Sequence, residues 1–550
     1  MDSSSEFETQ STTFLDWFKA QPGTQFHPSL KIVDLRDRNA GRGIIATQDI
    51  AADTDLFTIP RDIIISEETS TLAKKLPELF SKATATAAAA TANTNVDIDD
   101  DDDDDDDIDV DDESDPSVPD SWLYLILILL YESLHHTTSQ WLPYLSILPQ
   151  RADSFNTLMF WTDGDLSALK GSAMLNKIGK ESANRMFTER IIPVVRRHAD
   201  IFYPGGDSQQ QQQQLSDSAL LERCHIIGSL IMSYAFDLQP DEDEEDADSD
   251  TEMAGVEEDG WIEDRAAPGA GAGSSSSTKS TMGMVPMADM LNADAEFNAH
   301  LSHGDDSLTM TSLREIKAGE EVLNYYGPLP NGELLRRYGY TSPKHARYDV
   351  VEIPWSLVKT VTRGYDDYLP QSQTQKRRQT QIQAQVDKIL DEIERDEDNR
   401  LGLDLDLDFD DGVENDDSAA FVLERDSGDP DDQGLCVVDA KFVSFPEDMV
   451  NVVGHVVTRV LSSSSSTTKP FKSKKDEAKR IKGVTLDILK SIVLRRLDLY
   501  PTTLAEDQNL LLNTTTTIRE RMAVNVRLGE KRLLVEALEW TESKLTKYRD

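Results

Sequence analysis

Residues Ile316–Gly327 have the sequence IKAGEEVLNYYG, and this segment decides how the fold of the chain is interpreted. Its Lys-Ala-Gly start is typical of a turn, because glycine adopts backbone conformations that other residues avoid. The residues that follow predict a strand that ends in two tyrosines, Tyr325 and Tyr326. Tyrosines at such a point can be core residues with hydrogen-bonded hydroxyls. The segment alone therefore leaves a structural and a catalytic interpretation open.

Three other segments add candidate ligand-binding groups. Gly-Arg-Gly at 41–43 separates two strand-like runs, where glycines either let the backbone approach a ligand or simply form a hairpin turn. MVPMADMLN at 284–292 ends in an asparagine, whose amide can bind a ligand or cap a turn. ELLRRYGY at 333–340 brings two more tyrosines, and Tyr348 follows. Each segment is a weak signal when taken alone.

In this order the four segments resemble the SET-domain methyltransferases, and more narrowly the class of the Rubisco large-subunit methyltransferase. MVPMADMLNAD and PNGELLRRYGY are most similar to the fungal ribosomal-protein subgroup of that class and to its animal relatives that act on non-histone proteins. Residues 495–503 and 521–534 are similar to the core of the helical domain that follows the SET domain in the class. The resemblance implies an α+β fold: a SET-domain β-fold with a helical insertion, followed by an all-α C-terminal substrate-binding domain.

The resemblance also implies S-adenosyl-L-methionine as cofactor and the methylation of a lysine on a non-histone protein, with a ribosomal large-subunit protein as the expected substrate. Many members have a histidine after the asparagine, and here Ala293 replaces it; the family histidine contributes largely through its backbone, so the cofactor assignment is kept. The implied cofactor-binding residues are Gly41, Arg42, Gly43, Asn292, Ala293 and Tyr338. The implied catalytic residues are Tyr326, which would orient the lysine nitrogen, and Tyr338. The implied substrate-binding residues are Trp141, Tyr234, Tyr326 and Tyr348.

Two of these assignments have an equally simple alternative, since Trp141 and Tyr234 can be core aromatics on helices. Two other functions also stay open: a SET-domain adaptor without enzymatic activity, and a protein-histidine methyltransferase.

Low-complexity segments divide the chain into ordered blocks, because they lack the apolar content that would offset their ordering entropy. The expected divisions are an N-terminal part of the SET domain at 1–82, an acidic insertion at 83–119, a helical insertion at 120–239, an acidic and Gly/Ser-rich loop at 240–280, the C-terminal part of the SET domain with the catalytic motifs at 281–353, and a helical substrate-binding domain at 354–550 with an insertion of no fixed structure at 364–430.

The net charge of the chain distinguishes nucleic-acid partners from basic protein partners. Lys and Arg number 55 against 102 Asp and Glu, which gives a net charge of −47. Nucleic-acid binding needs a basic surface, so no direct nucleic-acid partner is expected, and a basic protein is favoured instead. We expect a monomer. The basic run 472–482 is either a nuclear address or the solvated start of a helix.

Cysteine usage and hydropathy indicate the compartment. Cys224 and Cys436 lie far apart and form no cluster, so neither a disulfide framework nor a metal site is expected. The apolar run 122–131 is too short to span a bilayer and predicts a buried helix, so no membrane partner is expected. The N-terminus does not resemble a secretory signal, and the expected location is the nucleus, the cytoplasm or both.

Overall fold

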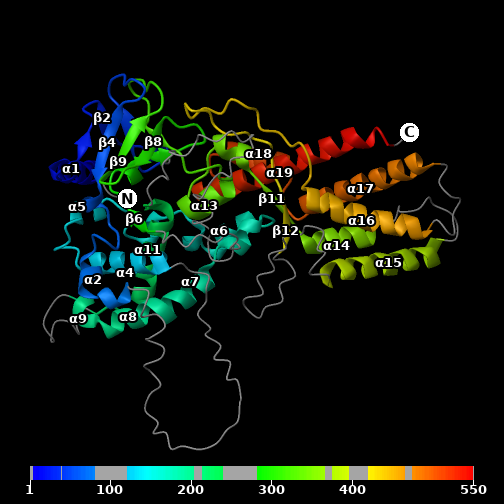
Figure 1. Ribbon diagram of the computed structural model, residues 1–550, viewed down its shortest axis with the longest axis horizontal. Helices are drawn as coiled ribbons and strands as arrows, with labels where there is room; N and C mark the ends of the chain where they lie inside the picture. Colours follow the sequence, from blue (N-terminus) through cyan, green and yellow to red (C-terminus); the bar gives the residue numbers. More distant parts are fainter. Residues whose placement is uncertain are drawn as a thin grey trace, which may run out of the picture.

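The computed structural model describes residues 4–38, 40–80, 120–203, 214–238, 281–365, 375–395, 419–464 and 473–548. Figure 1 shows a β-rich region on one side and a long helical extension on the other, with the C-terminus at the far end of that extension. The predicted acidic insertions at 83–119 and 240–280 lie outside the described residues, so those two expectations stay predictions.

The β-rich region is assembled from segments far apart in the sequence. Its largest sheet has four antiparallel strands in the order β1-β4-β9-β8, so strands from the start of the chain pair with strands that follow residue 298. Smaller pairs complete the region: β2 with β3, β5 with β6, and β7 with β10 in parallel. The strands are β1 (Gln25–Phe26), β2 (Leu30–Asp34), β3 (Arg42–Ala46), β4 (Asp55–Pro60), β5 (Ala235–Asp237), β6 (Met282–Met284), β7 (Asn292–Ala293), β8 (Ala299–His303), β9 (Ser307–Ser312) and β10 (Leu323–Asn324).

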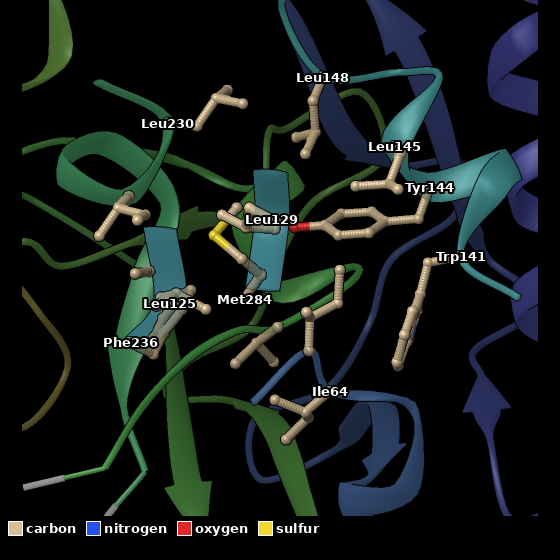
Figure 2. Close-up of a cluster of buried hydrophobic side chains, with 14 of the residues drawn as sticks. Ile64, Leu125, Leu129, Trp141, Tyr144, Leu145, Leu148, Leu230, Phe236 and Met284 are labelled. Atoms are coloured by element: carbon tan, nitrogen blue, oxygen red, sulfur yellow. The ribbon is translucent and has the colours of Figure 1, made fainter. Parts of the chain in front are cut away.

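Helices between β4 and β5 share the core of the sheets. The apolar run 122–131 forms most of α4, and its residues 125–131 are all buried, which confirms the expected buried helix. Figure 2 shows Leu125 and Leu129 of this helix beside Phe236 and Met284, which come from the strands. No helix within the described ranges is long and apolar enough to cross a membrane. The helices here are α2 (Thr71–Lys75), α4 (Asp120–Leu134), α5 (Leu142–Leu145), α6 (Asp163–Leu166), α7 (Lys180–Met186), α8 (Ile192–Arg197), α9 (Ala199–Phe202) and α11 (Asp217–Tyr234), and α1 (Ser4–Ala20) precedes β1.

The helical extension has its own apolar core. Its long helices pack in sequence order, α14 on α15, α15 on α16 and α16 on α17, while α17 and α18 lie against α19. A two-stranded sheet of β11 and β12 lies at its base. The elements are α13 (Asn331–Tyr338), β11 (Val351–Pro354), α14 (Trp355–Gly364), α15 (Gln375–Arg395), β12 (Ala420–Leu423), α16 (Glu447–Ser464), α17 (Lys474–Leu497), α18 (Leu504–Leu512) and α19 (Ile518–Leu545).

One expected segment differs from the structure. The insertion of no fixed structure at 364–430 contains α15 and β12. Four apolar residues of α15 recur at helical spacing and are buried in the core of the extension, which stabilises the helix despite its glutamine-rich flank. They are Val386, Ile389, Leu390 and Ile393. Residues 474–482 of the basic run form the start of α17, where the Ser473 side chain accepts a hydrogen bond from the backbone N–H of Asp476.

The SET region and the extension meet at a glycine of α19. Asp349 is buried, and its Oδ1 accepts hydrogen bonds from the backbone and the side chain of Asn331. A Cβ placed on Gly529 would lie 1.8 Å from Asp349 Oδ2. Nearby, Glu530 accepts hydrogen bonds from Ser172 and Tyr500, each at 2.6 Å. The glycine that weakens the helical propensity of α19 therefore permits the closest approach between the two regions.

We predict that Gly529→Ala lowers the free energy of unfolding by about 1–3 kcal/mol, because the new methyl group collides with a buried carboxylate. Gly454 is the matched control: it lies inside α16, and a Cβ there would meet only Thr485 Oγ1, at 4.0 Å. Gly454→Ala should raise stability by up to about 1 kcal/mol through helix propensity. Denaturant unfolding of both variants measures the difference; equal effects would contradict the proposed close contact.

Candidate active site

The side-chain amide of Asn292, at the end of segment 284–292, contacts both the Gly-Arg-Gly segment 41–43 and the segment 316–327. Asn292 Nδ2 donates to the carbonyl oxygen of Arg42 at 3.2 Å and to Glu321 Oε1 at 2.7 Å. A Cβ on Gly43 would lie 2.8 Å from Glu321 Oε1 and 3.0 Å from Asn292 Nδ2. Only glycine allows β3 to lie this close to the asparagine and the carboxylate. Asn292 thus takes part in packing, and it also brings the segments 41–43, 284–292 and 316–327 to one place.

The first glycine of the Gly-Arg-Gly segment has different surroundings. The Gly41 carbonyl accepts a hydrogen bond from the Leu35 backbone at 2.9 Å, which closes the hairpin turn between β2 and β3. A Cβ on Gly41 would have no heavy atom within 4 Å. The turn is therefore a true hairpin turn, and it borders open space next to the Asn292 contact.

The side chain of Arg42 points away from that contact and holds α1. Its guanidinium donates to Ser11 Oγ at 3.0 Å, to Gln10 Oε1 at 2.9 Å and to the Ile147 carbonyl at 2.9 Å. It also lies 3.9 Å from the centre of the Phe7 ring. Only the backbone of Arg42 faces Asn292. The sequence analysis missed α1, because nothing in its sequence marks it as a partner of the Gly-Arg-Gly turn.

The predicted tyrosines form a stacked cluster at the ends of β10 and α13. The rings of Tyr326 and Tyr338 are 4.7 Å apart and nearly parallel, and Tyr340 meets Tyr338 edge-on. Tyr326 donates its hydroxyl hydrogen to the Leu291 carbonyl at 2.9 Å, and Tyr340 donates to the Ala293 carbonyl at 3.3 Å. The cluster therefore borders the Asn292–Ala293 strand, and Ala293 contributes through its backbone.

Burial fixes the protonation state of these phenols. Burial raises the pKa of Tyr326 well above its usual range, and the neighbouring tyrosines raise it further. Burial also raises the pKa of Tyr340, with a further contribution from Tyr338. Both side chains therefore stay neutral at physiological pH. Because the Tyr326 hydrogen is donated to a carbonyl, the lone pairs of its oxygen remain to accept a hydrogen bond.

A buried carboxyl lies next to this cluster. Tyr144 donates to Asp289 Oδ2 at 2.5 Å, and burial raises the pKa of Asp289 to about 7. Burial and the Asp289 charge raise the pKa of Tyr234 to about 12, so this predicted substrate residue lies near the carboxyl. Met287, in the same segment as Asp289, has a φ of 86°, which non-glycine residues rarely adopt. Neither Asp289 nor Tyr144 was predicted from the sequence, although the carboxyl lies inside the segment 284–292.

Tyr348 lies beside Tyr325, the residue before Tyr326, where a loop of the helical extension returns to the SET region. Its hydroxyl is 3.9 Å from Cys436 Sγ, and Cys436 in turn donates to the Ala295 carbonyl at 3.4 Å. Burial raises the pKa of Tyr348 to about 12. Close by, the rings of Phe297 and Tyr325 stack at 4.6 Å.

Trp141 lies in the core of the SET region. It is 1% exposed, and its indole N–H donates to the Ile63 carbonyl at 2.9 Å. Figure 2 shows it beside Tyr144 in the apolar cluster around α4. The geometry thus corresponds to the core alternative and not to a substrate contact. Among the described residues, no group of His, Cys, Asp and Glu could hold a metal ion.

We predict that Asp289→Asn flattens the pH dependence of stability between about pH 4 and 7. The folded-state pKa of about 7 lies above the ordinary aspartate pKa of 3.8, so the folded chain holds the extra proton in this interval and loses stability as the pH rises. In thermal unfolding across this range, the stability of the variant relative to the wild type should rise as the pH increases. Burial also raises the pKa of Asp349 to about 7, and this residue contributes the same pH dependence of stability to the variant and to the wild type. Parallel curves would show that Asp289 titrates normally.

Comparisons with known proteins agree with this arrangement. The model of the SET domain matches residues 41–327, and the model of the Rubisco LSMT substrate-binding domain matches residues 455–534. Solved structures of Rubisco LSMT share the fold, with a TM-score of 0.54 and 16% identity over 98% of this chain and 93% of theirs. The expected α+β architecture with a helical C-terminal domain is therefore confirmed.

Two curated relatives match part of the chain. "Ribosomal lysine N-methyltransferase 4" of Saccharomyces cerevisiae is 31% identical over 355 residues, which are 63% of this chain and 58% of the relative. "N-lysine methyltransferase setd6" of Xenopus laevis is 26% identical over 336 residues, which are 60% of this chain and 57% of the relative. These matches thus span less than two thirds of either relative. Because the SET-domain model covers more than half of its residues, the chain belongs to the SET-domain family.

Proposed function

We propose that this protein is an S-adenosyl-L-methionine-dependent protein-lysine N-methyltransferase that acts on a non-histone protein, namely a ribosomal large-subunit protein. One observation carries the proposal: the neutral, buried hydroxyl of Tyr326 donates to the Leu291 carbonyl directly beside the Asn292–Gly43 contact. The exposed turn at Gly41, where a Cβ would meet no atom within 4 Å, and an oxygen that can accept an amine hydrogen then lie in one neighbourhood.

The residues around the hairpin turn fit the cofactor. Gly41 borders open space, and the backbone of the turn and the amide of Asn292 offer polar groups to the amino-acid and nucleoside parts of the molecule. The ring of Tyr338 supplies a flat apolar surface next to them. Bound there, the cofactor would supply an electrophilic methyl group on a sulfonium.

The tyrosine cluster would prepare the lysine for attack. A free lysine has a pKa of about 10.4, so nearly all of it is protonated at neutral pH. The half-buried aromatic rings of the cluster would disfavour the ammonium and lower that pKa. The Tyr326 oxygen would accept a hydrogen bond from the amine and hold its nitrogen about 3–3.5 Å from the methyl group, which is the distance that in-line attack requires. Since Tyr326 stays neutral, it orients the amine and does not act as the base.

The proposed substrate rests on similarity and on charge. The yeast relative is named for ribosomal lysine methylation, and ribosomal proteins are basic partners for a chain with a net charge of −47. The nucleus, the cytoplasm or both are the proposed location, where such a substrate would be encountered, and a monomer is the proposed state.

We predict that Tyr326→Phe lowers the turnover of methyl transfer to ribosomal proteins by about 100-fold or more, the usual scale for losing one preorganised polar group at a reacting centre. Cofactor affinity should change little, because the ring and its stacking remain. Tyr548→Phe, at the far C-terminal end, is the matched control. Normal turnover in the Tyr326→Phe variant would exclude the role proposed for its hydroxyl.

We predict that Asn292→Ala weakens cofactor binding about tenfold or more, since it removes the amide that holds the Gly-Arg-Gly turn and faces the cofactor space. Calorimetric titration with the cofactor measures this effect without a substrate. Unchanged affinity would refute the assignment of Asn292, and no binding to the wild type would favour the adaptor interpretation.

A further inference from the structure

A loop of the helical extension reaches back to the tyrosine cluster. We name residues 424–443, between β12 and α16, the strap. Figure 1 shows this segment, coloured yellow to gold, running from the base of the extension toward the β-rich region. It contains no regular helix or strand, although its two ends are joined by a backbone bridge between Asp426 and Lys441.

The strap is held firmly against the SET region. The Gly434 carbonyl accepts a hydrogen bond from the Phe297 backbone at 3.0 Å, and a Cβ on Gly434 would lie 2.4 Å from the Phe297 carbonyl oxygen. Arg347 donates to the carbonyl of Val438 at 2.7 Å. Arg425 donates to the Ala346 carbonyl at 2.9 Å. These contacts fix the path of the backbone, so its side chains are presented in a defined way.

Apolar side chains of the strap face solvent. Val437 is 69% exposed, Val438 is 47% exposed and Val443 is 43% exposed. The first two directly follow Cys436, whose sulfur is 3.9 Å from the Tyr348 hydroxyl. Consecutive Cα atoms are about 3.8 Å apart, so the exposed pair begins one residue from the contact with Tyr348. Exposed apolar groups beside a binding site are typical of recognition surfaces.

The negative charge around these valines favours a positively charged partner. Six acidic residues but only two basic ones lie between 424 and 441. One of the two, Arg425, is already paired with Glu536. Asp429 and Asp439 are both exposed close to the valines. A cationic partner is therefore attracted, and an acidic one is repelled.

We propose that the strap binds an extended, basic segment of the protein substrate, next to the lysine that enters the tyrosine cluster. An apolar side chain of that segment would cover Val437 and Val438, and flanking arginine or lysine side chains would lie near Asp429 and Asp439. This inference rests on the proposed function. It adds the chemistry of the substrate sequence next to the target lysine: cationic residues around an apolar one.

Binding of a lysine-free peptide of alternating arginine and valine, followed by fluorescence anisotropy with the full chain, tests the strap without requiring methyl transfer. We expect the double variant Val437→Ser/Val438→Ser to weaken this binding about tenfold, because two apolar contacts are lost. Leu512→Ser is the matched control, since Leu512 is 81% exposed on α18. We expect Asp429→Asn/Asp439→Asn to weaken binding and to reduce its dependence on salt.

Two peptides complete the design: arginine alternating with serine, and glutamate alternating with valine, both of which should bind more weakly than the arginine–valine peptide. Equal affinity of the wild type and the valine double variant would overturn the inference. A different result would contradict the proposed function: no transfer of a methyl group from the cofactor to ribosomal proteins by the wild type. In that case the peptide measurement still tests the role of the strap.

Discussion

The contact between the Asn292 amide, the Arg42 carbonyl and Glu321 is the interaction on which the site depends. It joins residues 250 positions apart in the chain, and it exists because Gly43 has no side chain. Asn292 also lies in β7, which pairs in parallel with β10, and Tyr326, just after β10, donates to the Leu291 carbonyl. The Gly-Arg-Gly turn, the asparagine and the tyrosine cluster are thus parts of one packed unit.

Burial gives this unit its chemistry. Phenols that stay neutral, with their hydrogens donated to backbone carbonyls, offer lone pairs of fixed direction to an incoming amine. Preorganised groups of this kind need no rearrangement during the reaction, which is where much of enzymatic acceleration originates. The carboxyl of Asp289, bound to Tyr144, introduces a titratable group into the same interior. Outside the unit, Arg42 connects the turn to α1, so the N-terminal helix is also part of the support.

The sequence predicted the fold class and the meeting of its four segments, because the order of local motifs is visible along the chain. It did not predict which group each side chain would face. Trp141 matched a substrate position in sequence but lies in the core, since an indole N–H can be satisfied by a backbone carbonyl such as that of Ile63. α15 was not predicted because glutamines and charged residues surround its four buried apolar residues in the sequence. Asp289 gave no signal, because its raised pKa arises only from tertiary burial.

Residue-level mass spectrometry of ribosomal proteins, incubated with this protein and isotopically labelled S-adenosyl-L-methionine, tests the central claim most directly. We expect label on the side-chain nitrogen of a lysine in a ribosomal large-subunit protein. Label on a histidine, or no label on any ribosomal protein, would contradict it.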